Sequence, residues 1–433
     1  MAASPTSAPR PDGAPSRWPL LVVFLVVFID LLGFGIVLPV MPRQVEPYFD
    51  ALRLGRLARG GLIGLLFSVF SLMQFLFSPL WGRLSDRVGR RPMLLLSLAG
   101  SVVFYAVYGW ATTFPPERAA TALGLMLAAR IGAGIAGASV GTAAAVIADC
   151  TAPENRARGM ALIGIAFGAG FTLGPLIAYF GLGLFGRQPW GVGAIASLLS
   201  AVALLIAWFV FGETRRPGTR PARELPSLAR TAAVLGMPTV GGLVLVYFLS
   251  IFAFANFEAT LARLTKAAFD MGDDANFLVF AFIGFMLMLA GGMYRPLAKR
   301  LPETALLAGG VALMILGLTA VGVVAWRTQA GPVAGGPLAT LFHVGAAVAV
   351  AGFACVNPSV SALISRRTDP HRQGEVLGVN QSFASLGRIL GPLAGSVLFD
   401  LHPSHTLPFV AAVAVLTAVL GIVPRLRRGV DRA

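Results

Sequence analysis

Residues 82–92 read GRLSDRVGRRP and join two apolar runs, 60–81 and 93–113. An apolar run of about 20 residues is long enough to cross a bilayer as a helix, so the stretch predicts a short charged turn between two membrane spans. Gly82 and Gly89 permit a tight reversal of the chain, and Pro92 suits the first turn of the following helix. The pattern therefore favours a membrane protein whose helices are joined by short polar loops.

The composition extends that prediction to the whole chain. Of its 433 residues, 56% are hydrophobic and 12% are charged, whereas a soluble domain carries about 25% charged residues. The 51 glycines suit close packing of helices in lipid. The net charge of +15 requires no nucleic-acid partner, because membrane proteins gather Arg at the cytoplasmic ends of their helices. We therefore expect contact with a lipid bilayer and none with nucleic acid.

The apolar runs number twelve and divide into two sets of six. They lie near residues 18–41, 60–81, 93–113, 121–147, 159–182, 190–211, 238–259, 275–294, 304–326, 337–364, 375–398 and 406–424. The segment between the sixth and seventh runs is rich in Arg and Pro, which is typical of a linker. The predicted organisation is a disordered N-terminus (1–17), a six-helix bundle (18–211), a cytoplasmic linker (212–237), a second six-helix bundle (238–424) and a tail (425–433).

The distribution of positive charge predicts the orientation. Most of the 34 Lys and Arg residues fall in the terminal and even-numbered connecting segments, so both termini are expected in the cytoplasm. Loop 43–59 is an exception, because its four arginines fall on the opposite side of the membrane.

The two halves of the chain also repeat a motif. TAPENRARG at 151–159 leads to the pair Gly174-Pro175, and TDPHRQGE at 368–375 leads to Gly391-Pro392, over the same spacing of 22 residues from proline to proline. Two parallel repeats of six helices around a site at the midplane are one arrangement of secondary transporters.

Three segments resemble signatures of the major facilitator superfamily of transporters. They are GRLSDRVGRR at 82–91, LMLAARIGAGIAGASVG at 125–141 and FGAGFTLGPLIAYFG at 167–181, the last of which is similar to an antiporter signature. Together with the segment DLLGFGIVLP that begins at Asp30, they resemble the tetracycline and multidrug efflux branch. The resemblance implies an all-α fold of two six-helix bundles, alternating access, and a monomer that spans the bacterial cytoplasmic (inner) membrane.

Four ionisable residues lie inside the predicted spans: Asp30, Arg130, Glu258 and Arg388. Each costs about 2.5–3.5 kcal/mol at mid-bilayer, so each needs a partner, water or a function. A carboxyl at Asp30 can take up and release a proton as its surroundings gain and lose water. We therefore predict proton coupling by Asp30, Arg130 and Glu258. The alternatives are static ion pairs for Asp30 and Arg130, an interfacial position for Glu258 and a bracing role for Arg388.

Two further sets of residues are predicted to serve transport. The substrate cavity is expected to be lined by Phe34, Ser71, Gln74, Tyr247, Asn256, Asn357, Gln381 and Arg388. Gating is expected from Gly82, Asp86, Arg87, Gly89, Arg90 and Arg91, together with the two Gly-Pro pairs, Gly174-Pro175 and Gly391-Pro392. Scattered polar residues in spans can instead hold helices together, which is the alternative interpretation for the cavity set.

The predicted function is proton-driven export of small amphiphilic compounds. Tetracycline exporters carry an acid in the third helix, where this chain has Phe104, so tetracycline–metal recognition is not expected. The chain has no Walker-type phosphate loop, and its four histidines show no metal-site spacing, so we expect no enzyme activity, cofactor or metal. Two alternatives remain, namely proton-coupled uptake of a defined metabolite and a membrane sensor that does not transport.

Overall fold

The computed structural model describes residues 18–151, 156–214, 228–332, 335–369 and 372–428, and every regular element within these ranges is a helix. Twelve helical stretches in this part of the chain are long and apolar enough to cross a membrane. The all-α polytopic prediction is therefore confirmed. The N-terminal segment 1–17, residues 215–227 of the linker, residues 429–433 of the tail, and Pro153 and Pro370 of the repeated motif lie outside the described residues.

The α-helices are α1 (Trp18–Val37), α2 (Met41–Ala51), α3 (Arg56–Val88), α4 (Arg90–Ala111), α5 (Ala119–Ala136), α6 (Val140–Cys150), α7 (Arg156–Gly181), α8 (Gly191–Val210), α9 (Leu228–Leu235), α10 (Val240–Phe269), α11 (Asp273–Ala298), α12 (Glu303–Arg327), α13 (Pro337–Arg366), α14 (Gln373–Leu401) and α15 (Leu407–Arg428). The fourth span consists of α5, the short 3₁₀ segment η2 (Gly137–Ser139) and α6.

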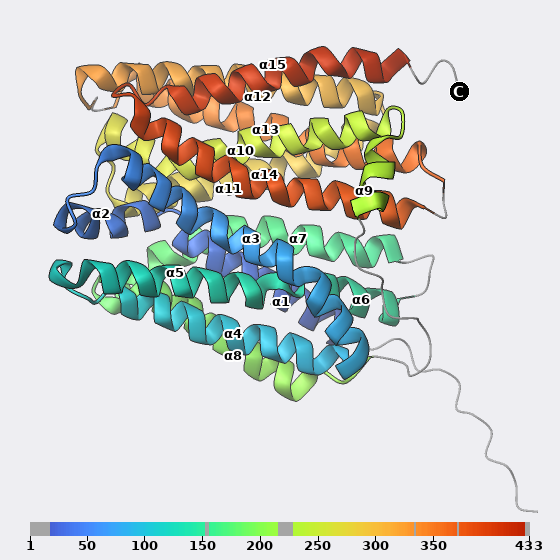
Figure 1. Ribbon diagram of the computed structural model, residues 1–433, viewed down its shortest axis with the longest axis horizontal. Helices are drawn as coiled ribbons and strands as arrows, with labels where there is room; N and C mark the ends of the chain where they lie inside the picture. Colours follow the sequence, from blue (N-terminus) through green and yellow to red (C-terminus); the bar gives the residue numbers. More distant parts are fainter. Residues whose placement is uncertain (1–17, 152–155, 215–227, 333–334, 370–371, 429–433) are drawn as a thin grey trace, which may run out of the picture.

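The spans pack as two groups, α1 with α3–α8 and α10 with α11–α15 (Figure 1). Glycines let helices within a group approach closely, because a Cβ at Gly193 would lie 2.4 Å from the backbone nitrogen of Gly109. Extensive contact between the groups is made by α3 with α14 and by α7 with α11. These two pairs of helices therefore form the interface between the groups.

The two groups meet at the end of the molecule that carries α2, here called the α2 end. A Cβ at Gly60 would lie 2.5 Å from the carbonyl oxygen of Ser396, and one at Gly64 would lie 2.8 Å from the Cα of Leu393. Ser68 Oγ also donates to the carbonyl oxygen of Ile389 at 2.5 Å. Backbone-to-backbone contact of this kind leaves no room for water or substrate between α3 and α14 there.

Toward the opposite end, α3 and α14 diverge (Figure 1). This end, here called the linker end, contains the turn between α3 and α4 and the ends of α8 and α15. A Cβ added at Gly82 of α3 or at Gly378 of α14 would meet no atom within 4 Å. The groups are therefore joined at the α2 end and apart at the linker end.

Arg43, one of the arginines of segment 43–59, forms an ion pair between the two groups of helices. This segment was expected to be a loop, but its first part is α2. Arg43 forms an ion pair with Asp273 of α11 at 2.8 Å and also donates to the carbonyl oxygen of Met271. Arg187 pairs with Asp274 next to it, so two arginines of the first group hold two aspartates of the second. This pairing accounts for positive charge on a side where the distribution of charge did not predict it.

The charged turn at 82–92 is more helical than the sequence predicted. Helix α3 continues to Val88 and α4 begins at Arg90, so Gly89 alone interrupts the helices. Its φ of 118° lies in the region that favours glycine, and a Cβ there would lie 2.4 Å from Oε2 of Glu213. The reversal therefore depends on one residue and on the carboxylate beside it.

We expect Gly64→Leu to loosen the contact between the groups at the α2 end. Overpacking of a close contact costs about 1–3 kcal/mol, so the population open at this end should rise about fivefold or more. Gly61→Leu is the matched control, because a Cβ at Gly61 meets no atom within 4 Å. Distances between spin labels placed across the α2 end, in a cysteine-free background, measure the change. Identical distance distributions for the two variants would contradict this account of the interface.

Candidate functional site

Asp30 lies in the middle of α1, and its side chain is only 4% exposed. Its Oδ1 accepts a hydrogen bond from Ser101 Oγ of α4 at 3.2 Å, and its Oδ2 accepts one from Ser139 Oγ of η2 at 2.8 Å. Both partners are neutral hydroxyls, and no ion pair of Asp30 is found within the described ranges. A buried carboxyl without a cation beside it is the central feature of the site.

The fourth span changes from an α-helix to a short 3₁₀ turn beside this carboxyl. The sequence predicted one continuous helix over 121–147, whereas α5 ends at Ala136 and η2 intervenes before α6. Glycine weakens a helix, and here side chains of neighbouring helices add hydrogen bonds to the backbone: Ser97 Oγ donates to the carbonyl oxygen of Ala136 at 2.8 Å and Gln74 Nε2 to that of Gly137 at 3.0 Å. The 3₁₀ turn brings Ser139 to Asp30.

Arg130 of α5 is buried but does not reach Asp30. Its Nε donates to the carbonyl oxygen of Leu66 at 3.0 Å, and its guanidinium carbon lies 4.6 Å from the ring centroid of Phe70 and 5.5 Å from that of Phe34. Its Nη1 makes no hydrogen bond within the described part of the chain. The sequence predicted that Arg130 acts on Asp30, and in this conformation the guanidinium is held by a carbonyl and two aromatic rings instead.

Tyr105 of α4 is buried near the two charged residues. Its ring packs against α1, where a Cβ at Gly33 would lie 2.3 Å from the phenol oxygen. It is buried and lies within electrostatic range of both Asp30 and Arg130. The ring of Tyr105 therefore lies near both charged residues.

A second cluster lies in the other group of helices. Glu258 and Tyr247 of α10 lie within electrostatic range of Arg388 of α14, yet no ion pair joins Glu258 to Arg388 among the described residues. Among the described residues, the Oε1 of Glu258 is buried without a hydrogen-bond partner, while Arg388 is exposed and its side chain donates to Ser385 Oγ at 3.4 Å. The carboxyl of Glu258 and the guanidinium of Arg388 thus lie near each other without an ion pair among the described residues.

The remaining residues predicted to line a cavity are dispersed. Ser71 is buried in α3, and Asn256 is fully buried, with its amide donating to the carbonyl oxygen of Pro408 at 3.1 Å. Asn357 and Gln381 are exposed on α13 and α14. The structure therefore brings Phe34 and Gln74 next to the charged residues of the first group, and Tyr247 next to those of the second. Asn256 lies against α15.

The predicted gating motif is organised by Arg90. Its Nη1 pairs with Asp86 Oδ1 at 2.6 Å and donates to Ser85 Oγ at 2.7 Å, while its Nε pairs with Asp149 Oδ2 at 3.1 Å. All of these partners belong to the same group of helices. In this conformation Asp86 therefore faces its own group and not the beginning of α14.

Glu213, which the sequence did not single out, caps α4. Its carboxylate accepts from the backbone N–H groups of Arg90 at 2.9 Å and Arg91 at 3.1 Å. These are unpaired donors at a helix N-terminus, which favours negative charge. Arg91 also donates from its side chain to the carbonyl oxygen of Trp208 at 2.7 Å, whereas Arg87 is exposed.

The two Gly-Pro pairs pack equivalent helices together. A Cβ at Gly174 would lie 2.9 Å from the carbonyl oxygen of Leu32, which brings α7 against α1. A Cβ at Gly391 would lie 2.7 Å from the carbonyl oxygen of Phe252, which brings α14 against α10. The internal repeat read from the sequence thus corresponds to two matching helix contacts.

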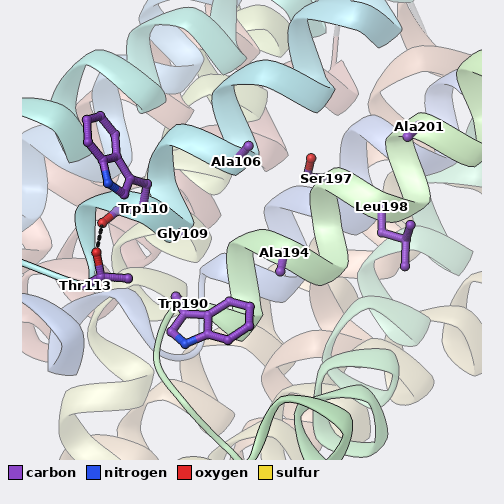
Figure 2. A pocket seen from close by; sticks show the side chains of 9 residues that line it. All are labelled: Ala106, Gly109, Trp110, Thr113, Trp190, Ala194, Ser197, Leu198 and Ala201. Carbon is purple, nitrogen blue, oxygen red and sulfur yellow. Dashed lines mark hydrogen bonds between the residues drawn. The ribbon is translucent and has the colours of Figure 1, made fainter.

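A pocket of about 520 Å³ lies away from these groups, between α4 and α8 (Figure 2). It is lined by Ala106, Gly109, Trp110, Thr113, Trp190, Ala194, Ser197, Leu198 and Ala201. No ionisable side chain contributes to it, and both helices belong to the first group. It is therefore not the site at which the charged residues could act.

Comparison with known proteins shows the family to which the chain belongs. The profile of the Major Facilitator Superfamily matches residues 23–392 and 296–432. The chain belongs to the major facilitator superfamily. It is 33% identical to major facilitator superfamily domain-containing protein 10 of Homo sapiens, over 91% of this chain and 90% of that protein. It is 30% identical to the class C tetracycline resistance protein of Escherichia coli, over 95% and 96% of the two chains.

Solved structures agree with this assignment. The human organic anion transporter MFSD10 (TETRAN) is 27% identical, with a TM-score of 0.64 over 95% of this chain and 100% of that one. A D-xylose–proton symporter shares the fold at 17% identity, with a TM-score of 0.77 over 94% and 97% of the two chains. The major facilitator fold and the prediction that the chain is a transporter of small molecules and not an enzyme are thereby confirmed.

We expect Asp86→Asn to increase the population with the linker end apart. When that end closes, Asp86 is expected to leave Arg90 and meet the N-terminus of α14, which attracts a carboxylate by about 0.3–1 kcal/mol. The variant should shift the population about two- to fivefold and reduce transport, with near-normal expression. Asp50→Asn is the control, because Asp50 pairs only with Arg59 in the described structure, at 2.7 Å. Unchanged accessibility of linker-end cysteines to labelling would contradict the prediction.

Proposed function

We propose that this major facilitator protein exports small amphiphilic compounds in exchange for protons, by alternating access. Asp30 carries the proposal, as a carboxyl that is buried in the middle of a span and has two hydroxyls as its partners among the described residues. Removing an ionised carboxylate from water is costly unless a charge balances it. Its proton occupancy therefore depends on how much water and which charges reach it in each conformation.

The conformation supports a cycle with two alternative openings. With the linker end in the cytoplasm, as the distribution of Arg and Lys predicts, this structure faces inward. Opening of the α2 end would require Arg43 and Arg187 to release Asp273 and Asp274. If proton binding at Asp30 changes the balance between the two openings, a proton gradient can drive the substrate in the other direction.

The relatives support export, and Phe104 argues against one class of substrate. Several of them are tetracycline resistance proteins. Phe104 stands where those exporters are expected to have an acid, and it packs against α5, since a Cβ at Gly132 would lie 2.1 Å from its ring. We therefore propose export of other amphiphilic compounds, by a monomer in a bacterial inner membrane, and not tetracycline–metal recognition.

Asp30→Asn should abolish uphill transport, because an amide keeps the size of the side chain but carries no exchangeable acidic proton. Downhill exchange of substrate should continue. Dye or drug uptake into inside-out vesicles with an imposed pH gradient measures this, and accumulation in right-side-out vesicles would instead indicate the uptake alternative. If the variant still pumped uphill with unchanged pH dependence, Asp30 would not be the coupling residue, and Glu258 would be tested next.

A second candidate is an acidic substrate, and Arg388 favours it. A guanidinium in the middle of a span avoids hydrocarbon, so its exposure indicates a water-filled space between the two groups of helices. Arg388 has no ion pair within the described ranges. Its guanidinium can bind a carboxylate through two parallel hydrogen bonds. The relative described as an organic anion transporter agrees with this chemistry.

Arg388→Gln should therefore raise KM for acidic compounds about tenfold or more, since a hydrogen bond to a charged group contributes about 1.5–3 kcal/mol. Uncharged compounds should be affected less. Arg388→Lys keeps the charge and should recover part of the affinity. Equal losses for acidic and uncharged compounds would show that Arg388 acts on the structure and not on the substrate.

A further inference from the structure

The pocket between α4 and α8 is a groove on the outer edge of the first group of helices (Figure 1). Its volume of about 520 Å³ falls within the range of small-molecule sites, about 300–1,000 Å³. Trp110 and Leu198 in its lining are 56% and 59% exposed, so the groove opens to the outside of the molecule. Both helices are candidate membrane spans, and lipid is therefore the medium at this opening.

Short side chains create the groove. Gly109 and Gly193 let the two helices touch, since a Cβ at Gly193 would lie 2.4 Å from the backbone nitrogen of Gly109. Beside this contact, alanines line the two walls, with Ala106 on α4 and Ala194 and Ala201 on α8 (Figure 2). Larger side chains at these positions would fill the space that the pocket occupies.

The lining is apolar and leaves few polar groups free. Its two hydroxyls are satisfied by the protein, because Ser197 Oγ donates to the carbonyl oxygen of Val102 and Thr113 Oγ1 to that of Trp110, each at 2.8 Å. The indole N–H groups of Trp110 and Trp190 have no acceptor among the described residues. A ligand with a long apolar part and hydrogen-bond acceptors at one end fits this distribution.

The two tryptophans mark one end of the groove. Each indole packs against the edge of a phenylalanine, with ring centroids 5.3 Å apart for Trp110 and Phe114 and 5.2 Å apart for Trp190 and Phe185. This is the α2 end, because Tyr48 of α2 donates to the carbonyl oxygen of Phe114 at 3.0 Å. Tryptophan is enriched at the level of lipid headgroups, where its ring lies in apolar material and its N–H meets polar groups.

The length of the groove matches one leaflet of a bilayer. From Trp190 to Ala201 the chain along α8 rises about 16 Å, at about 1.5 Å per residue. The hydrocarbon core of a bilayer is about 30 Å thick, so each leaflet contributes about 15 Å. The groove therefore extends from the headgroup level at the α2 end to about the middle of the membrane.

A lipid chain fits this groove better than a second copy of the protein does. An α-helix with its side chains is about 10–12 Å across, and packed helices lie about 8–10 Å apart. A partner helix would therefore lie over the furrow between α4 and α8 without entering it. An acyl chain is narrow enough to lie along the furrow.

We propose that this groove binds one acyl chain of a phospholipid from the leaflet at the α2 end, with the indoles of Trp110 and Trp190 donating to the ester oxygens of the lipid. The bound lipid contacts α4 and α8 together. Lipid binding here needs no transport step, so the assignment goes beyond the proposed function.

The test uses the purified full-length protein in detergent, titrated with dioleoyl phosphatidylethanolamine, and counts bound lipid by native mass spectrometry. We expect about one tightly held lipid per chain. Ala106→Phe fills the groove and should weaken binding by about tenfold or more, the size expected from overpacking a close contact. Ala128→Phe is the matched control, because Ala128 is an exposed alanine of α5 that does not line the groove. It should bind the lipid as the wild type does.

Two further probes separate the acyl chain from the headgroup. Dihexanoyl phosphatidylethanolamine keeps the headgroup but buries much less apolar surface, so it should bind about tenfold more weakly or worse. Oleoyl lysophosphatidylethanolamine has a single chain and should bind about as tightly as the diacyl lipid. Joint replacement of both indoles, Trp110→Phe with Trp190→Phe, should weaken binding about fivefold or more, because two hydrogen bonds are lost.

Equal lipid affinity of the wild type and Ala106→Phe would overturn the site, and so would equal affinity for the short-chain and long-chain lipids. A dimer that Ala106→Phe dissociates would overturn it in favour of a second copy of the chain. Each of these results would leave the proposed function intact, because uphill transport and its dependence on Asp30 are measured separately in vesicles.

Discussion

The central constraint on the structure is the carboxyl of Asp30, which is buried in the middle of a span with no cation beside it in the described part of the chain. Asp30 is accommodated by two serine hydroxyls, one of which reaches it only because the fourth span changes to a 3₁₀ turn at Gly137–Ser139. Side chains of neighbouring helices also donate hydrogen bonds to the carbonyl oxygens of Ala136 and Gly137, which fixes the position of this 3₁₀ segment. The same segment therefore supplies a hydrogen-bond partner for the carboxyl and is itself held in place by neighbouring side chains. The protonation of Asp30 therefore depends on how much water reaches it.

Helix α3 connects this environment to both ends of the molecule. At the α2 end, its Gly64 contacts α14. In the middle, the carbonyl of Leu66 holds Arg130 and the side chain of Gln74 holds the 3₁₀ segment of the fourth span. At the linker end, Asp86 pairs with the arginine that organises the turn into α4. A tilt of α3 would therefore change the contact between the groups and the surroundings of the buried charges together, and Asp86 lies on the same helix beyond Pro79.

Much of the fold was readable from the sequence, because hydrophobic length and charge distribution are properties of single segments. The twelve spans and the reversal at Gly89 follow from them, and Asp30 stands out as a charge in an apolar run. The side chains that contact Asp30 could not be predicted from single segments. Ser101 and Tyr105 lie four residues apart on one face of α4, a polar stripe that could have been noticed. Ser139 depends on a 3₁₀ segment, and the glycines of this span indicate a weak helix without indicating where it changes. That Arg130 contacts a carbonyl and not Asp30 depends on the conformation, and Glu213 reaches α4 from a distant segment.

The central claim is that the protonation of Asp30 is linked to which end of the molecule is open. Distances between spin labels across the α2 end and across the linker end, measured as a function of pH in the wild type and in Asp30→Asn, test it most directly. The account predicts that pH shifts the balance between the two openings in the wild type and that the variant loses this dependence while still populating both. A pH-driven shift of the same size in Asp30→Asn would contradict it.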